Sequence, residues 1–224
     1  MGKVEKSFIL QPVAQRILAQ RATLFLLLLL MLPPSWPFVK GNGGRVERAG
    51  YPVTEEAAEL FKIYSLVRSA RQDTDDGWVW QIAKTVMEES QRHMMDPLLV
   101  LAVIGVESDF NHTAISLKGA KGLMQIRPFV AEAVAGDRKS LWGDERIAKT
   151  PPLYDPTVNI KLGVFYLDTL QKDFGDTKLA LAAYNHGPTR IKSQIAEEQR
   201  VPLGYATRVL ATYQRYREDL PETN

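Results

Sequence analysis

An uninterrupted apolar run, Leu98–Val106, constrains the fold of this chain more than any other feature. It follows the pair Asp96-Pro97, which is typical of a helix start, because Asp accepts hydrogen bonds from free N–H groups and Pro fits the first turn. The run is apolar on all sides rather than along one stripe, which predicts a helix buried inside a domain. It is shorter than the roughly 20 residues that a helix needs to cross a bilayer. We therefore expect it to lie inside a soluble core rather than a membrane.

Glu107 stands near the end of this expected helix. Burying a carboxylate costs free energy unless the group is paired or protonated. Apolar surroundings raise the pKa of a glutamate, and a raised pKa makes the side chain a usable general acid near neutral pH. The alternative is that the helix ends at Glu107 and its side chain reaches water.

The segment after Glu107 combines glycines with neutral hydrogen-bonding side chains. Gly119 and Gly122 permit tight turns and the close approach of a ligand. Ser116 and Gln125 are suited to holding a polar, uncharged ligand such as a sugar.

Four sequence blocks in a fixed order resemble the lytic transglycosylases of the soluble, lysozyme-like type, whose domain cleaves bacterial cell-wall glycan. The blocks are Glu-Ser-x-Phe from Glu107, Ala-x-Ser ending at Ser116, Gly-Ala-x-Gly-Leu-Met-Gln-Ile-x-Pro from Gly119, and Ala-Tyr-Asn-His-Gly from Ala183. The resemblance covers roughly residues 79–216. It departs from the family before the final helix, where the family often has Glu-Thr and this chain has Leu203-Gly204.

The resemblance implies cleavage of the β-1,4 bond between N-acetylmuramic acid and N-acetylglucosamine, with formation of 1,6-anhydromuramic acid and Glu107 as single acid and base. It also implies that Ser116 bonds the N-acetyl group and that Gln125 and the Met124 backbone position the sugar. Tyr184 would bond Glu107 or the substrate, and Asn185 would fix the local turn.

The residues themselves supply one carboxylate rather than two. Most glycosidases use a pair. Asp109 lies two positions after Glu107, which points it to a different face of a helix, and Asp96 is interpreted as a helix cap. One acid with several neutral partners favours a single-acid mechanism.

Three rival interpretations stay open. A muramidase would share the fold and the glutamate but would use water as the nucleophile. A non-catalytic wall-binding or assembly module would use the same surface without cleavage. An enzyme of this kind would also fit a secretion or conjugation machine that opens the wall locally, as well as it fits general wall remodelling.

Composition and pattern indicate a globular, nearly all-helical protein. The chain is 45% hydrophobic and 24% charged, which is enough to bury a core. No stretch shows the alternation of a strand. Because the chain lacks cysteine and its three histidines follow no ligand spacing, we expect no disulfide, no metal and no cofactor. The expected fold is an all-α, lysozyme-like single domain with a substrate groove.

The N-terminal part is interpreted as a targeting segment. Residues 1–39 carry four basic residues and one acidic residue, all before the apolar run Leu24–Leu32, which indicates a signal peptide or an N-terminal membrane anchor. We expect export to the periplasm, with membrane association through the leader if it is retained. The remainder carries 24 basic and 25 acidic residues, so nucleic acid is not an expected partner and peptidoglycan glycan strands are.

The expected organisation follows from these segments. Residues 40–76 form a linker and an N-terminal helix, and residues 77–220 form the lysozyme-like transglycosylase domain. Further helices are expected at 54–71, 78–94, 129–135, 156–174, 178–183 and from about 203, and residues 136–154 are expected to be irregular. In the last helix, the stripe of Tyr205, Val209, Tyr213 and Tyr216 is interpreted as core rather than binding surface.

Overall fold

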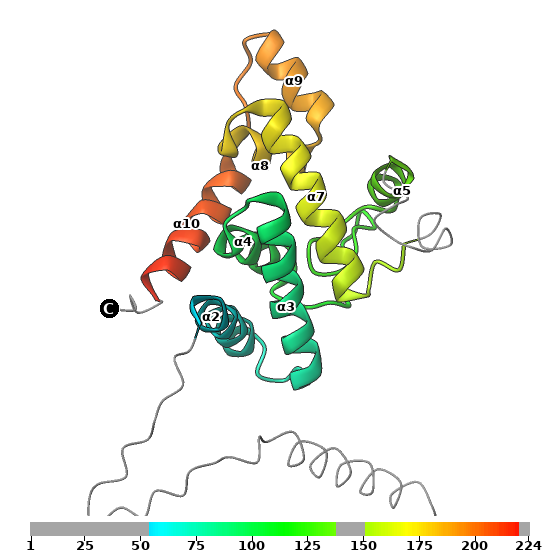
Figure 1. Ribbon diagram of the computed structural model, residues 1–224. Coiled ribbons are helices and arrows are strands. Elements are labelled where there is room, and N and C mark those ends of the chain that lie inside the picture. Colours follow the sequence, from blue (N-terminus) through cyan, green and yellow to red (C-terminus); the bar gives the residue numbers. More distant parts are fainter. Residues whose placement is uncertain (1–53, 138–150, 220–224) are drawn as a thin grey trace, which may run out of the picture. The chain divides into compact units, whose positions relative to one another are not determined.

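The computed structural model describes residues 54–137 and 151–219, which fold into helices connected by short loops (Figure 1). In these ranges the only bridges between extended residues are two isolated ones, in the loop after α4. The helices are α2 Glu55–Ala70, α3 Asp76–His93, α4 Pro97–Ser108, α5 Pro128–Asp137, α7 Pro156–Phe174, α8 Thr177–His186, α9 Pro188–Ala196 and α10 Gly204–Glu218. The predicted all-α fold class is confirmed.

Local capping chemistry sets the helix starts that the sequence predicts. The carboxylate of Asp96 accepts from the Leu98 N–H at 2.8 Å at the start of α4, and that of Asp155 accepts from the Val158 N–H at 3.0 Å at the start of α7. The Thr54 hydroxyl accepts from the Ala57 N–H at the start of α2. Each cap satisfies a backbone donor that the helix itself leaves free.

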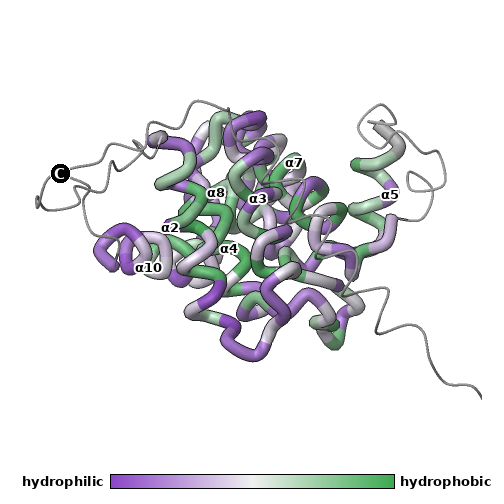
Figure 2. Tube along the Cα trace, turned by 60° about the horizontal axis from the view of Figure 1, so that its bottom comes forward, coloured by the Kyte–Doolittle hydropathy of each residue, from purple (hydrophilic) through white to green (hydrophobic). Residues whose placement is uncertain are grey.

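Helix α4 occupies the centre of the core, as its all-round apolar sequence predicts. Leu99–Ile104 are all buried, and the helix packs against α2, α3 and α10. Each large apolar side chain buried in this way contributes about 1.5–3 kcal/mol. Figure 2 shows hydrophobic colour along α4, whereas α10 is largely hydrophilic or neutral.

The region after α7 differs from the sequence prediction. Helix α8 continues through His186 rather than ending near residue 183, and its C-cap Gly187 adopts φ 93° and ψ 137°. Pro188 ends α8 and also begins α9, a helix that the sequence analysis did not assign. Proline suits this position because its missing N–H is one that a first turn leaves unpaired. Ile191 then anchors α9 in a small cluster with Leu170 of α7 and alanines of α8.

Several expectations lie outside the described residues. The leader, residues 1–39, and most of the irregular segment 136–154 belong to this group, so the predicted domain boundaries stay predictions. Among the helices that are described, none combines the length and the apolar character that a membrane crossing requires.

Candidate active site

Glu107 lies in the last turn of α4 with its carboxylate half-buried and held from α10. The Tyr205 hydroxyl donates a 2.7 Å hydrogen bond to its Oε1 atom. Burial raises the pKa of Glu107 above its ordinary value and outweighs the hydrogen bond from Tyr205 and the charge of Arg208, which both lower it. A protonated Glu107 is therefore favoured closer to neutral pH than for an exposed glutamate.

Two tyrosines flank this carboxyl group, Tyr205 buried and Tyr184 partly buried. Burial, together with the negative charge of Glu107, raises the pKa of both Tyr184 and Tyr205 well above 10, so both phenols stay protonated and donate. The Tyr184 hydroxyl donates to the Met124 carbonyl at 2.8 Å. The hydroxyl group that donates to Glu107 is therefore that of Tyr205, which was interpreted from the sequence as a core residue. Tyr184 instead bonds the neighbouring loop.

The loop between α4 and α5 folds back on itself beside Glu107. Lys121 forms isolated antiparallel bridges with both Ile115 and Ile126. Gly122 takes φ 76°, and its N–H donates to the Ala114 carbonyl at 2.9 Å. Glycine takes a positive φ more readily than any residue with a Cβ atom.

Ser116 and Gln125 take part in closing this loop. The Ser116 hydroxyl oxygen accepts from the Ala120 N–H at 3.0 Å, which leaves its hydrogen available to a ligand. The Gln125 amide Nε2 donates to the Gly122 carbonyl at 2.9 Å and to the Ala114 carbonyl at 3.2 Å. Ser116 is exposed, whereas Met124, further along the same loop, is buried.

Asn159 of α7 bonds the loop through its side chain. The sequence analysis did not identify this residue. Its side chain is fully buried; Oδ1 accepts from the Met124 N–H at 2.7 Å, and Nδ2 donates to the carbonyls of Lys121 and Leu153. A Cβ on Gly122 would lie 2.3 Å from this amide nitrogen. A buried amide with both donors and its acceptor satisfied fixes the backbone that it binds.

Two further contacts complete the support. The Ser108 hydroxyl donates to the Leu123 carbonyl at 2.7 Å and so joins the end of α4 to the loop. Gly163 of α7 leaves room for the Met124 side chain, because a Cβ there would lie 2.3 Å from its sulfur atom. Glu107, Tyr184, Met124 and Gln125 are thereby drawn into one region. Asn185 is exposed near the end of α8, and its role in the turn stays a prediction.

The chemistry available to this site is that of one half-buried acid among neutral hydrogen-bonding groups. In the described part of the chain, the charge that acts on the pKa of Glu107 is that of Arg208, and no second carboxylate contributes. Asp109 is the exposed C-cap of α4. Residues 54–137 and 151–219 contain no cluster of histidine and carboxylate side chains that would hold a metal ion.

Comparison with known proteins identifies the family. Residues 84–202, more than half of the chain, match the transglycosylase SLT domain, so the chain belongs to this family. The membrane-bound lytic murein transglycosylase C of Haemophilus influenzae (strain PittEE) is 40% identical over 91 residues, which are 41% of this chain and 25% of the relative. The membrane-bound lytic murein transglycosylase E of Buchnera aphidicola (subsp. Acyrthosiphon pisum, strain APS) is 35% identical over 115 residues, 51% of this chain and 49% of the relative. The chain thus spans about half or less of these relatives.

A solved structure supports the fold. The 70 kDa soluble lytic transglycosylase of Escherichia coli superposes with a TM-score of 0.52 at 23% identity, over 76% of this chain and 31% of the other. At this identity the similarity bears on the fold, and it agrees with the helical architecture described above.

Proposed function

We propose that the protein is a lytic transglycosylase that cleaves the β-1,4 bond between N-acetylmuramic acid and N-acetylglucosamine in peptidoglycan. The observation that carries this proposal is the Glu107 carboxyl group, half-buried with a raised pKa and bonded at Oε1 by Tyr205. Family membership and the names of the curated relatives support the same reaction class.

In the first step Glu107 acts as the acid. Because Oε1 accepts the Tyr205 hydrogen bond, Oε2 carries the proton and donates it to the glycosidic oxygen as the bond to the anomeric carbon breaks. The N-acetyl group of the muramyl residue stabilises the cationic centre and replaces a second carboxylate.

In the second step Glu107 acts as the base. Its carboxylate accepts the proton of the muramyl 6-hydroxyl while that oxygen attacks the anomeric carbon. The product is a 1,6-anhydro ring, Glu107 is protonated again, and no water is consumed.

The neighbouring residues orient the sugar in this proposal. The free hydroxyl hydrogen of Ser116 donates to the N-acetyl carbonyl, while Gln125 and the Met124 backbone position the ring. Tyr184 has its hydrogen on the Met124 carbonyl, so its oxygen faces the substrate as an acceptor. Asn185 holds the turn after α8.

We further propose that the enzyme works on glycan strands in the periplasm, delivered by the leader at residues 1–39. Both curated relatives described above are named membrane-bound. Experiment must decide whether the leader is cleaved or retained as an anchor. It must also decide whether the enzyme serves a secretion machine or general wall turnover.

Digestion of purified peptidoglycan tests the reaction. The soluble muropeptides released by the wild type and by Glu107→Gln are weighed by mass spectrometry. Products lighter by one water than reducing-end fragments, absent with the variant, are the expected result. Reducing-end products would assign a muramidase instead, and retained binding without any release from either protein would assign a wall-binding module.

A further inference from the structure

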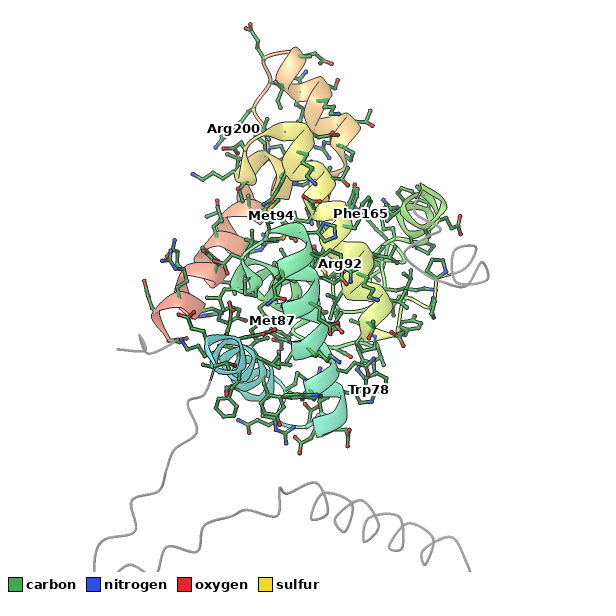
Figure 3. All side chains as sticks on the ribbon, in the orientation of Figure 1. Trp78, Met87, Arg92, Met94, Phe165 and Arg200 are labelled. Atoms are coloured by element: carbon green, nitrogen blue, oxygen red, sulfur yellow. The ribbon has the colours of Figure 1, made fainter. Side chains whose placement is uncertain are left out.

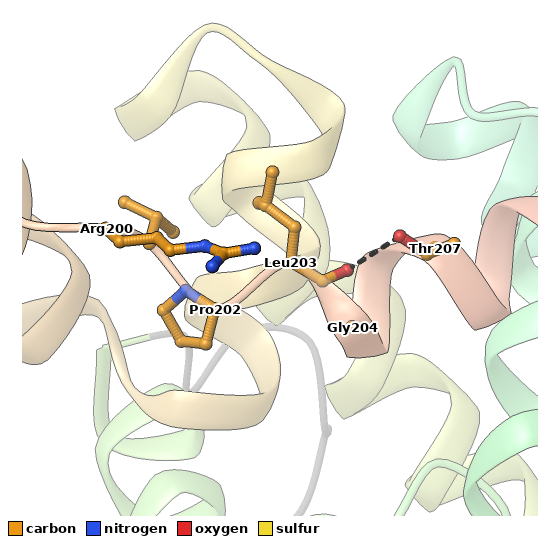
Figure 4. A pocket seen from close by; sticks show the side chains of 6 residues that line it. Arg200, Pro202, Leu203, Gly204 and Thr207 are labelled. Atoms are coloured by element: carbon orange, nitrogen blue, oxygen red, sulfur yellow. Dashed lines mark hydrogen bonds between the residues drawn. The ribbon is translucent and has the colours of Figure 1, made fainter.

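A groove of about 670 Å³ lies between the first half of α2, the end of α3 and the start of α4. We call it the α2 groove. It is larger than the hollow of about 470 Å³ at the connection from α9 to α10, where Figure 4 shows the Arg200 side chain beside the Pro202 ring. The two also differ in charge, because the smaller hollow carries an arginine and the α2 groove carries carboxylates.

The floor of the α2 groove is apolar. Ile63 of α2 and Met87 of α3, which Figure 3 labels, are buried beneath it, and Leu98 of α4 is partly buried. Three helices therefore contribute one apolar side chain each to the same surface. A groove with such a floor suits the apolar face of an amphipathic helix.

The rim of the α2 groove is acidic. Glu55, Glu56 and Glu59 lie in the first two turns of α2, at spacings of three and four residues, where like charges repel. Among the residues that the structure describes, no basic side chain forms an ion pair with any of the three. Glu55 and Glu56 stabilise the positive end of the helix, but that effect fades after the first turn and does not account for Glu59.

Asp96 adds a fourth carboxylate at the start of α4. It is held in place there, because it accepts from the Leu98 N–H at 2.8 Å and from the Tyr213 hydroxyl at 2.6 Å. Of the described residues that line the groove, Lys62 alone is basic. Arg217 lies over the Tyr213 ring, 5.7 Å from its centroid, and does not line the groove. Four carboxylates against one ammonium group favour a cationic occupant.

The α2 groove is separate from the proposed reaction site. Asp96 is the N-cap of α4, whereas Glu107 lies in its last turn. With a rise of about 1.5 Å per residue, these two positions are about 16 Å apart along the helix. Helix α2 also precedes residues 84–202, which match the family domain. An occupant of the groove therefore leaves Glu107 open.

We propose that the α2 groove docks a basic amphipathic helix of a second protein. The apolar face of that helix packs on the floor, and its lysine or arginine side chains meet the glutamates of the rim. Complementary charges steer the approach and fix the orientation, while buried apolar surface supplies affinity. The wall from Glu55 to Ile63 is about 12 Å long, which matches about two turns of a partner helix. This inference does not rest on the proposed function, because it concerns another surface.

Binding of synthetic peptides to the full chain tests the proposal. The probe is a helical peptide of about 15 residues with leucine every three or four positions and lysine beside each leucine. One control peptide has glutamate for each lysine, and the other has serine for each leucine. Fluorescence anisotropy should show that the leucine–lysine peptide binds at least about tenfold more tightly than either control, and that added salt raises its Kd. Equal binding of the serine peptide, or of the acidic peptide, would overturn the proposal.

Two double variants locate the bound peptide. Glu56→Gln with Glu59→Gln should raise its Kd about tenfold at low salt, because two exposed charge pairs are lost. Glu132→Gln with Glu198→Gln is the matched control, which removes the same charge on α5 and after α9 and should leave Kd within about twofold of wild type. All four glutamates are exposed, so both variants should fold. Equal weakening by both would mean that the peptide responds to net charge alone and would overturn the assignment to the groove.

Sedimentation velocity separates a second protein from a second copy of this chain. We expect the wild type without peptide to sediment as a monomer. A dimer that dissociates on Glu56→Gln with Glu59→Gln would assign the groove to self-association and would overturn the proposal.

Discussion

The Tyr205 hydroxyl donates a 2.7 Å hydrogen bond to Glu107 and so joins the start of α10 to the end of α4. The ring of Tyr205 is in turn covered by the Arg208 guanidinium, whose central carbon lies 5.8 Å from the ring centroid. Tyr205 is buried and cannot leave this position without disturbing the core. It therefore holds one oxygen of the Glu107 carboxyl group in place and lowers the pKa of that group, against the larger effect of burial.

Tyr205→Phe should move the falling, alkaline limb of the pH–rate profile to higher pH. The hydrogen bond from Tyr205 lowers the pKa of Glu107, so its removal lets burial raise that pKa further. In the proposed reaction the first step needs protonated Glu107, so activity should then persist to higher pH. We also expect kcat below this limb to fall about tenfold, because the carboxyl group loses its fixed orientation.

Tyr213→Phe is the control for this profile. Tyr213 lies on the same helix, but its hydroxyl donates to Asp96 rather than Glu107. It should leave the limb in place. An unchanged or acid-shifted limb in Tyr205→Phe would show that Tyr205 does not act on the catalytic proton.

Asn159→Ala should destabilise the fold and weaken catalysis together. The change leaves the Met124 N–H and the Leu153 carbonyl without their partner and removes one of the two hydrogen bonds on the Lys121 carbonyl, which keeps the bond from the Ile126 N–H. Unsatisfied buried groups cost about 1–3 kcal/mol each, so we expect a loss of about 3 kcal/mol or more in the free energy of unfolding. Where the variant is still folded, kcat should fall at least about tenfold, because the Met124 and Gln125 backbone shifts.

Urea unfolding and turnover of peptidoglycan measure these two effects. Lys161→Ala, two residues further along α7 and partly exposed, should leave both close to wild type. If Asn159→Ala lost stability but kept wild-type kcat, the amide would support the fold without positioning the site.

The sequence was most informative where the signal is local. Asp96-Pro97 and Asp155-Pro156 each contain the cap and the first turn of their own helix, so α4 and α7 could be placed from adjacent residues alone. The helix after Pro188 was harder to predict, because the same residue ends α8 and begins α9. Only the spacing of Ile191 and Ile195 indicates α9.

Contacts between distant segments could not be predicted in this way. The bond from Tyr205 to Glu107 spans 98 positions, and the bond from Met124 to Asn159 spans 35. Tyr205 lies in an apolar stripe, and nothing in that stripe distinguishes a packed tyrosine from one whose hydroxyl reaches a carboxylate. Asn159 similarly follows a helix cap as an ordinary polar residue, and its role emerges only when α7 packs under the loop.

Gly163→Ala should destabilise the protein although alanine favours helices. A Cβ at residue 163 would lie 2.3 Å from the Met124 sulfur and 2.8 Å from its Cβ, so the loop or α7 must move. Overpacking of this kind costs about 1–3 kcal/mol. Thermal unfolding should show a lower Tm. Turnover should also fall, because the Met124 backbone positions the sugar in the proposed function.

Gly204→Ala is the matched control, because it measures how replacing glycine by alanine in a helix affects stability when no atom is in the way. It makes the same chemical change at the start of α10, where a Cβ meets open space. It should be neutral or slightly stabilising. A Gly163→Ala variant as stable and active as Gly204→Ala would mean that the packing of Met124 against α7 does not hold the loop.

Asp168→Asn should remove a stabilising contribution that depends on pH. Asp168 of α7 is buried against α3; burial raises the pKa of its carboxyl group, but hydrogen bonds from Lys172 and from His93 outweigh it and lower the pKa overall. A carboxyl group with a lowered folded-state pKa stabilises the fold above its unfolded-state pKa, about 4, and loses that effect as the pH falls through the folded-state value. The variant should therefore lose about 2 kcal/mol near pH 7 relative to wild type, and the difference should shrink as the pH falls below about 4.

Asp173→Asn, which breaks the exposed 3.1 Å ion pair with Lys192, is the comparison and should cost less than about 1 kcal/mol. Urea unfolding at pH 7, 5 and 3 measures both variants, and a difference for Asp168→Asn that widens below pH 4 would contradict the assignment, because the carboxylate would then not be the stabilising species.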